Sequence, residues 1–125
     1  MSLRIHNDLY QGPKAMDDPG DAETIQVVAD LSICEMVSAT AETRTLADPT
    51  KPGIRFTLRL LTDGGDVIVY AAQGFNVQLE TRATFADAGD TLELISVTKT
   101  RDGTEAAGVY RWQVLDDNVG VTISA

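Results

Sequence analysis

The residue types that most often carry catalysis are scarce in this chain, which holds one histidine, His6, and one cysteine, Cys34. A Ser–His–Asp or Cys–His system needs its base held rigidly within hydrogen-bonding reach of the nucleophile. His6 lies in an N-terminal stretch with a weak secondary-structure signal, which is a poor setting for such a base. One His and one Cys also argue against a zinc site of the usual ligand types. The motifs GxGxxG, GxxxxGK[ST] and HExxH are missing as well, so we predict no catalytic residues, no metal site and no cofactor.

Cys34 itself sits in an apolar stretch, with Leu31, Ile33, Met36 and Val37 around it. A free cysteine in such a setting is usually buried and inert. The sequence therefore predicts a small buried hydrophobe at this position rather than a reactive thiol.

Carboxylates are the remaining candidates for chemistry. A glycosidase needs two acids about 5–10 Å apart in a cleft, often with one pKa raised by burial. Glu80 and Glu93 fall in expected strands and are able to face a cleft, although we favour solvent-facing positions paired with Arg82 or Arg59. We expect no enzymatic activity, because the other acids occupy turns, where they face water and help the chain reverse. These turn acids are Asp63, Asp66, Asp87, Asp90, Asp116 and Asp117.

Two binding roles stay open beside this prediction. Clustered oxygen ligands suit calcium, but no stretch matches the Asp-x-Asp-x-Asp-Gly loop with its distal Glu, so solvated turns are favoured. Trp112, Tyr110 and Tyr70 would form a sugar-binding shelf if they were exposed together. Strand aromatics this close together are more often core or subunit-interface residues, which is the interpretation we favour.

The charge balance argues against nucleic acid and anionic membranes as partners. The chain of 125 residues has a net charge of −9, with eight acids and two bases in residues 1–43, a balance of −6. An acidic surface repels phosphate, and the basic patch of a nucleic-acid-binding protein is missing. No apolar run is long enough for a transmembrane helix, and the first residues lack the pattern of a signal peptide, so we expect synthesis in a cytoplasm.

The chain divides into an N-terminal segment, residues 1–22, and one domain, residues 23–125. Gly and Pro in the first segment break both helix and strand, which is typical of an extended arm or of a frayed terminus. An arm that orders against a partner would use apolar anchors, and four such residues occur within the first ten positions. These candidate partner-binding residues are Leu3, Ile5, Leu9 and Tyr10.

The pattern of the domain predicts a series of short strands. In Ile54–Leu61, apolar residues alternate with polar ones, the pattern of a half-buried strand. Asp63-Gly-Gly-Asp66 is able to form the tight turn of a hairpin to the following strand. Residues 31–39 fit a strand or a short helix, and we favour the strand because its neighbours are strands. The expected strands cover residues 24–29, 31–39, 43–47, 54–61, 67–72, 75–85, 91–98, 109–116 and 119–123.

Such evenly spaced strands with Gly turns predict an all-β fold: an antiparallel β-sandwich or a small β-barrel with an extended N-terminal arm. Residues 99–108 are polar and predict a hairpin loop, while the last strand runs almost to the C-terminus and ties it into a sheet.

Three stretches, residues 43–69, 84–97 and 110–114, together resemble the β-rich domains of small tailed-bacteriophage virion proteins, of the capsid decoration (cement) or head-appendage type. The resemblance covers about residues 40–124 and rests on the short strands and their Pro/Gly and acidic Gly corners. It implies a structural protein without catalysis that binds the major capsid protein on the exterior of the virion after assembly in the host cytoplasm. It also implies a homo-oligomer, a trimer or dimer, with Tyr110 and Trp112 as residues of the subunit interface. An alternative is a receptor- or glycan-binding domain of a head or tail appendage, which would use the aromatic strand and the loop of residues 99–108.

Overall fold

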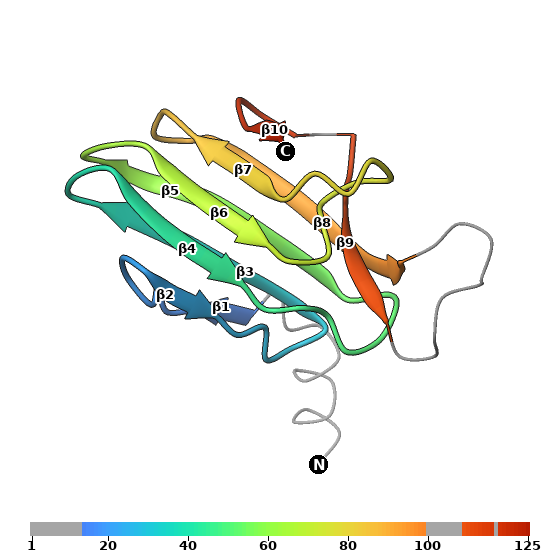
Figure 1. Ribbon diagram of the computed structural model, residues 1–125. Helices are drawn as coiled ribbons and strands as arrows, with labels where there is room; N and C mark the ends of the chain where they lie inside the picture. Colours follow the sequence, from blue (N-terminus) through green and yellow to red (C-terminus); the bar gives the residue numbers. More distant parts are fainter. Residues whose placement is uncertain (1–13, 100–108, 117) are drawn as a thin grey trace, which may run out of the picture.

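A computed structural model describes residues 14–99, 109–116 and 118–125, which form ten strands in two sheets of five strands each (Figure 1). The two sheets face each other as a sandwich and do not close into a barrel, so the predicted all-β sandwich is confirmed. Among the described residues no helix is long and apolar enough to cross a membrane.

The first sheet has the strand order β1-β3-β5-β8-β9. Its strands are β1 (Lys14–Met16), β3 (Leu31–Ser38), β5 (Arg55–Asp63), β8 (Thr91–Thr98) and β9 (Tyr110–Val114).

The second sheet has the order β10-β7-β6-β4-β2. Its strands are β2 (Glu23–Ile25), β4 (Glu42–Leu46), β6 (Val67–Ala71), β7 (Arg82–Phe85) and β10 (Thr122–Ser124).

The first six strands alternate between the two sheets, so this part of the chain winds as a flattened coil. β1, β3 and β5 pair in parallel in one sheet, and β2, β4 and β6 pair in parallel in the other. The prediction of a hairpin at Asp63–Asp66 is therefore wrong: this turn carries the chain from β5 in the first sheet to β6 in the second. The prediction of purely antiparallel sheets is wrong for the same reason.

The last four strands pair antiparallel and complete both sheets. β7 pairs with β6, β8 with β5, β9 with β8, and β10 with β7. The loop predicted at residues 99–108 therefore connects the antiparallel pair β8 and β9, although residues 100–108 lie outside the described part of the chain. β10 confirms that the C-terminus belongs to a sheet. The strand predicted over residues 75–85 is shorter in the structure, which has a loop up to residue 81 and β7 after it.

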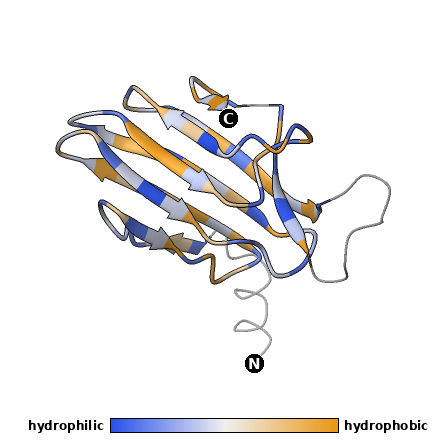
Figure 2. Cartoon of the chain, in the orientation of Figure 1, coloured by the Kyte–Doolittle hydropathy of each residue, from blue (hydrophilic) through white to orange (hydrophobic). Residues whose placement is uncertain are grey.

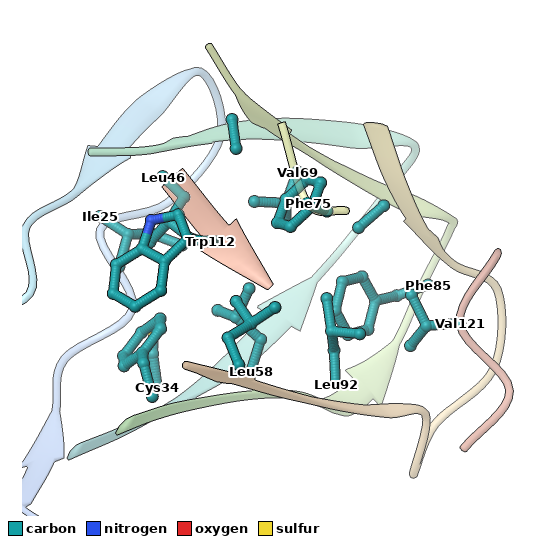
Figure 3. Packing of buried hydrophobic residues seen from close by; sticks show 14 of the residues in the cluster. Ile25, Cys34, Leu46, Leu58, Val69, Phe75, Phe85, Leu92, Trp112 and Val121 are labelled. Atoms are coloured by element: carbon teal, nitrogen blue, oxygen red, sulfur yellow. The ribbon is translucent and has the colours of Figure 1, made fainter. Parts of the chain in front are cut away.

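The core lies between the sheets and is built from the inward-facing residues of both. Along β5, Phe56, Leu58 and Leu60 are fully buried while Arg55 is exposed, which confirms the predicted alternation. β6 is hydrophobic along most of its length because it lies in the middle of the second sheet (Figure 2). Figure 3 shows the cluster, with Phe75 contributed by the loop between β6 and β7.

The sandwich includes part of the segment that the sequence assigns to an arm. β1 pairs in parallel with β3, and Met16 packs against the core, so residues 14–22 belong to the sandwich. The candidate anchors Leu3, Ile5, Leu9 and Tyr10, and also His6, lie outside the described residues.

Candidate interaction surface

The thiol of Cys34 is buried in the core, as predicted. Burial raises its pKa to about 11, with a smaller contribution from the nearby Asp18 carboxylate. The residue is therefore a protonated thiol at neutral pH and acts as a small apolar side chain.

Of the two carboxylates that the sequence places in strands, one lies in a loop and the other in a strand of the first sheet. Glu80 lies in the loop between β6 and β7, where its carboxylate accepts a hydrogen bond from Nδ2 of Asn76 at 2.8 Å. Glu93 lies on β8 in the first sheet, opposite Thr57 of β5. The prediction that Arg59 pairs with one of them is wrong, because Arg59 forms an ion pair with Glu35 on the neighbouring strand β3 at 2.9 Å.

The predicted aromatic group is split between the core and the surface. The side chain of Trp112 is 1% exposed and donates from Nε1 to the carbonyl oxygen of Ala47 at 3.0 Å. Its ring centroid lies 6.0 Å from that of Phe56, inside the cluster that Figure 3 shows. Trp112 therefore belongs to the core of its own chain, and its assignment to a subunit interface is wrong. Tyr110 is half-buried at the start of β9, an edge strand, and Tyr70 lies in the opposite sheet, so the aromatic shelf does not form.

The acidic turn at residues 86–90 is stabilised by hydrogen bonds to one of its own carboxylates. The carboxylate of Asp90, which is buried, accepts hydrogen bonds from the backbone N–H groups of Ala86 and Asp87, each at 3.0 Å. Gly120 approaches this carboxylate so closely that a Cβ atom would overlap it. In the described part of the chain, no three His, Cys, Asp or Glu side chains come together as a metal site would require.

The most heavily engaged charged group is a buried arginine in β4, which no motif in the sequence pointed to. Arg44 donates from Nε to Oδ1 of Asp18 at 2.6 Å and from Nη2 to Oδ2 at 2.8 Å. Nη2 also lies 3.1 Å from a carboxylate oxygen of Glu42. The same Asp18 carboxylate accepts from the backbone N–H of Val37, so one side chain holds the connection between β1 and β2 against both β3 and β4. One feature of the sequence could have indicated its burial. Arg44 lies two residues before Leu46 in the same strand, so both side chains point to the inward face.

Burial acts against the ionised form of Asp18 and on its own raises the pKa. The hydrogen bonds from Arg44, Val37 and Gly20 outweigh burial, and the pKa of Asp18 lies below its ordinary value of 3.8. At neutral pH the Asp18 carboxylate and the Arg44 guanidinium are therefore both charged and form an internal ion pair. This pair joins the connection between β1 and β2 to strand β4 of the second sheet.

The two ends of the sandwich differ in charge. At one end lie the connections of residues 17–22, 39–41, 64–66 and 86–90, to the left in Figure 1. Residues 115–116 and 118–121 follow β9, and Val119 bridges to Thr91 next to the 86–90 connection, so we count them with this end. We call it the acidic end. Its described acids are Asp17, Asp18, Asp21, Glu42, Asp63, Asp66, Asp87, Asp90 and Asp116, and the base among them, Arg44, is buried and paired.

The opposite end, which we call the loop end, consists of residues 26–30, 47–54 and 72–81 and the starts of β1, β3 and β9. Among the described residues at and next to this end, the acids Asp30, Asp48 and Glu80 do not outnumber the bases, which are Lys14, Lys51, Arg55, Arg82 and Lys99. Its exposed large hydrophobic residues are Val28, Leu31, Val77 and Leu79.

An acidic protein would therefore meet less electrostatic repulsion at the loop end than at the acidic end, because like charges across an interface oppose association. Protein–protein contacts typically combine an apolar centre with a polar rim. β1 also begins there, so the chain enters the sandwich at this end.

No known protein family matches the chain, and no curated protein matches its sequence.

Proposed function

We propose that this protein is a structural, non-catalytic component of a phage particle that binds the outer surface of the capsid through the loop end of its sandwich. The observation that supports this proposal is the charge asymmetry between the ends. Acids gather at one end, whereas at the other the described bases at least match the acids, and four of the seven exposed large hydrophobic residues of the described chain lie there. In this proposal the partner is the major capsid protein, and the acidic end faces away from it into the solvent.

The expected N-terminal arm fits the same orientation. Lys14, the first described residue, starts β1 at the loop end, on the side that we assign to the capsid. The anchors Leu3, Ile5, Leu9 and Tyr10 would then extend the contact across the capsid surface, and neither nucleic acid nor a membrane is a partner in this proposal. A trimer or dimer on the capsid belongs to the proposal as well, with Tyr110 as a residue of the subunit contact.

The glycan-binding alternative is less well supported. It relied on an aromatic platform, and the largest member of that platform, Trp112, fills the core instead.

A matched pair of variants on one strand tests the proposed orientation. Leu31 and Val37 lie on the outer face of β3, each 49% exposed, Leu31 at the loop end and Val37 toward the acidic end. The probe is capsid shells purified from particles whose gene for this chain has been deleted, and binding is measured by co-sedimentation. Leu31→Asp should weaken binding about tenfold, because it places a charge in an apolar contact, and Val37→Asp should leave binding unchanged. Shells that bind no wild-type protein, or a loss confined to Val37→Asp, would contradict the proposal.

A further inference from the structure

We propose that the tip of the loop between β6 and β7, Val77-Gln-Leu79, is a preformed apolar plug that inserts into an apolar pocket on the surface of the partner protein. The partner's identity rests on the proposed function, whereas the plug follows from the construction of the loop itself.

The base of this loop is fixed to both sheets. The side chain of Phe75 is fully buried in the core. Its backbone N–H donates to the carbonyl oxygen of Glu80 at 2.8 Å, and its carbonyl oxygen accepts from the N–H of Val114, in the first sheet, at 2.9 Å. The loop joins two strands of the second sheet, so these bonds fix its position relative to both layers.

Asn76 closes the loop above this base. Its Oδ1 accepts from the backbone N–H of Glu80 at 3.0 Å, and its Nδ2 donates to the carboxylate of Glu80 at 2.8 Å. The N–H of Leu79 donates to the carbonyl oxygen of Asn76 at 3.0 Å. The acid nearest the tip is thus held by an internal hydrogen bond, and the tip itself carries no charge.

The backbone at the tip adopts a conformation that leucine disfavours. Leu79 has φ +60°, in the left-handed region, which costs an ordinary L-residue about 1–2 kcal/mol. Gly74, with φ +95°, lies against the backbone of Leu79 so closely that a Cβ atom at residue 74 would come within 2.7 Å of its Cα. Gly or Asn would relieve the strain at residue 79, and strain of this kind concentrates at functional positions.

The strained position carries an apolar side chain that the fold does not bury. Leu79 is 43% exposed and Val77 is 41% exposed. A rigid loop loses its conformational freedom during folding, so an apolar tip presented in this way binds with little further loss of entropy. An uncharged apolar tip suits an apolar pocket on the surface of another protein, where anchor side chains of this kind bind.

The test replaces the side chain while keeping the backbone. Leu79→Asn removes the apolar side chain with a residue that tolerates positive φ, so thermal stability should stay equal or rise. Val119→Asn is the matched control, because Val119 is an exposed apolar residue at the opposite, acidic end, 58% exposed. Binding to the same purified capsid shells is measured as an affinity, together with the melting temperature of each variant. Leu79→Asn should weaken binding about tenfold or more, and Val119→Asn should not change it.

The outcomes separate the plug from the proposed function. Shells that bind wild type and Leu79→Asn equally overturn the plug and leave the proposed function standing, whereas shells that bind no wild-type protein overturn both. If Leu79→Asn melts at a lower temperature than wild type, Val77→Asn provides the second test, since Val77 has no left-handed φ to disturb. Wild-type binding to neutral phosphatidylcholine vesicles that Leu79→Asn abolishes would assign the tip to a lipid surface and overturn the plug.

Discussion

Arg44 and Asp18 form a two-point ion pair across 26 residues of sequence, with Nε 2.6 Å from Oδ1 and Nη2 2.8 Å from Oδ2. The guanidinium belongs to the second sheet and the carboxylate to the connection between β1 and β2. This pair therefore holds the first turn of the coil against the second.

We expect Asp18→Asn to lower the free energy of unfolding by about 3 kcal/mol, because it leaves a buried guanidinium with incomplete compensation. Urea denaturation at neutral pH measures the change. Asp30→Asn is the control: Asp30 pairs with Lys51 at 3.0 Å on the surface, and exposed pairs contribute about 0.5 kcal/mol or less. Equal losses in the two variants would show that the buried pair has no special role.

The same carboxylate should make stability depend on acid pH. The folded-state pKa of Asp18 lies below 3.8, so its contribution is fully present above pH 3.8 and is lost as the pH falls through the lower folded-state value. The gap in unfolding free energy between wild type and Asp18→Asn should therefore be constant near neutral pH and shrink below pH 3.8. Urea midpoints of both proteins across that range give the answer, and a gap that widens on acidification would contradict the assignment.

Two glycines with similar backbone angles should respond differently to alanine. Gly53 has φ +89°, and no atom lies within 4 Å of the position that a Cβ would take, so Gly53→Ala should cost about 1 kcal/mol from the backbone alone. Gly74 has φ +95° and also abuts Leu79, so Gly74→Ala should cost about 3 kcal/mol. Thermal melts of both variants measure the difference, and equal costs would mean that the β6–β7 loop moves aside freely.

Trp112 provides an optical test of the core, since it is the single tryptophan of the chain. A buried indole should emit at short wavelength and resist quenching by iodide, and both properties should be independent of protein concentration. Emission that shifts to longer wavelength on dilution, while the protein stays folded, would instead place Trp112 in a subunit contact.

The strands were largely predictable from the sequence, and their pairing was not. In β5 the alternation of Phe56, Leu58 and Leu60 with polar residues is local information, because it depends only on which side of a strand faces the core. Asp63-Gly-Gly-Asp66 was misassigned because a hairpin and a crossing between sheets need the same tight glycine turn. Gly64 and Gly65 both lie against the backbone of residues 38–41, where a Cβ would clash. That contact comes from the neighbouring turn of the coil, and no local pattern encodes it.

The features of the candidate interaction surface were harder to predict for a related reason. Tryptophan is a residue type enriched at interfaces, and the burial of Trp112 depends on a partner, Ala47, from the other half of the chain. The left-handed backbone of Leu79 follows from Gly74 and Asn76 acting together, whereas the sequence around residue 79 predicted a strand. To predict that the acids gather at one end, one must know which turns lie at the same end of the sandwich. That depends on the parallel winding of β1 to β6.

The parallel winding of β1 to β6 also makes the chain extensible. Each turn of the coil contacts its neighbouring turns, and within the described part of the chain β1 and β2 are the outermost strands on their side of each sheet. A further pair of strands placed before β1 would stack on these edges while leaving the antiparallel part and its hydrogen bonds unchanged, as happens in proteins built of stacked repeats. Lengthening the protein by one strand pair at this edge is thus a route by which a lineage, or a designer, can change its height without redesigning the core.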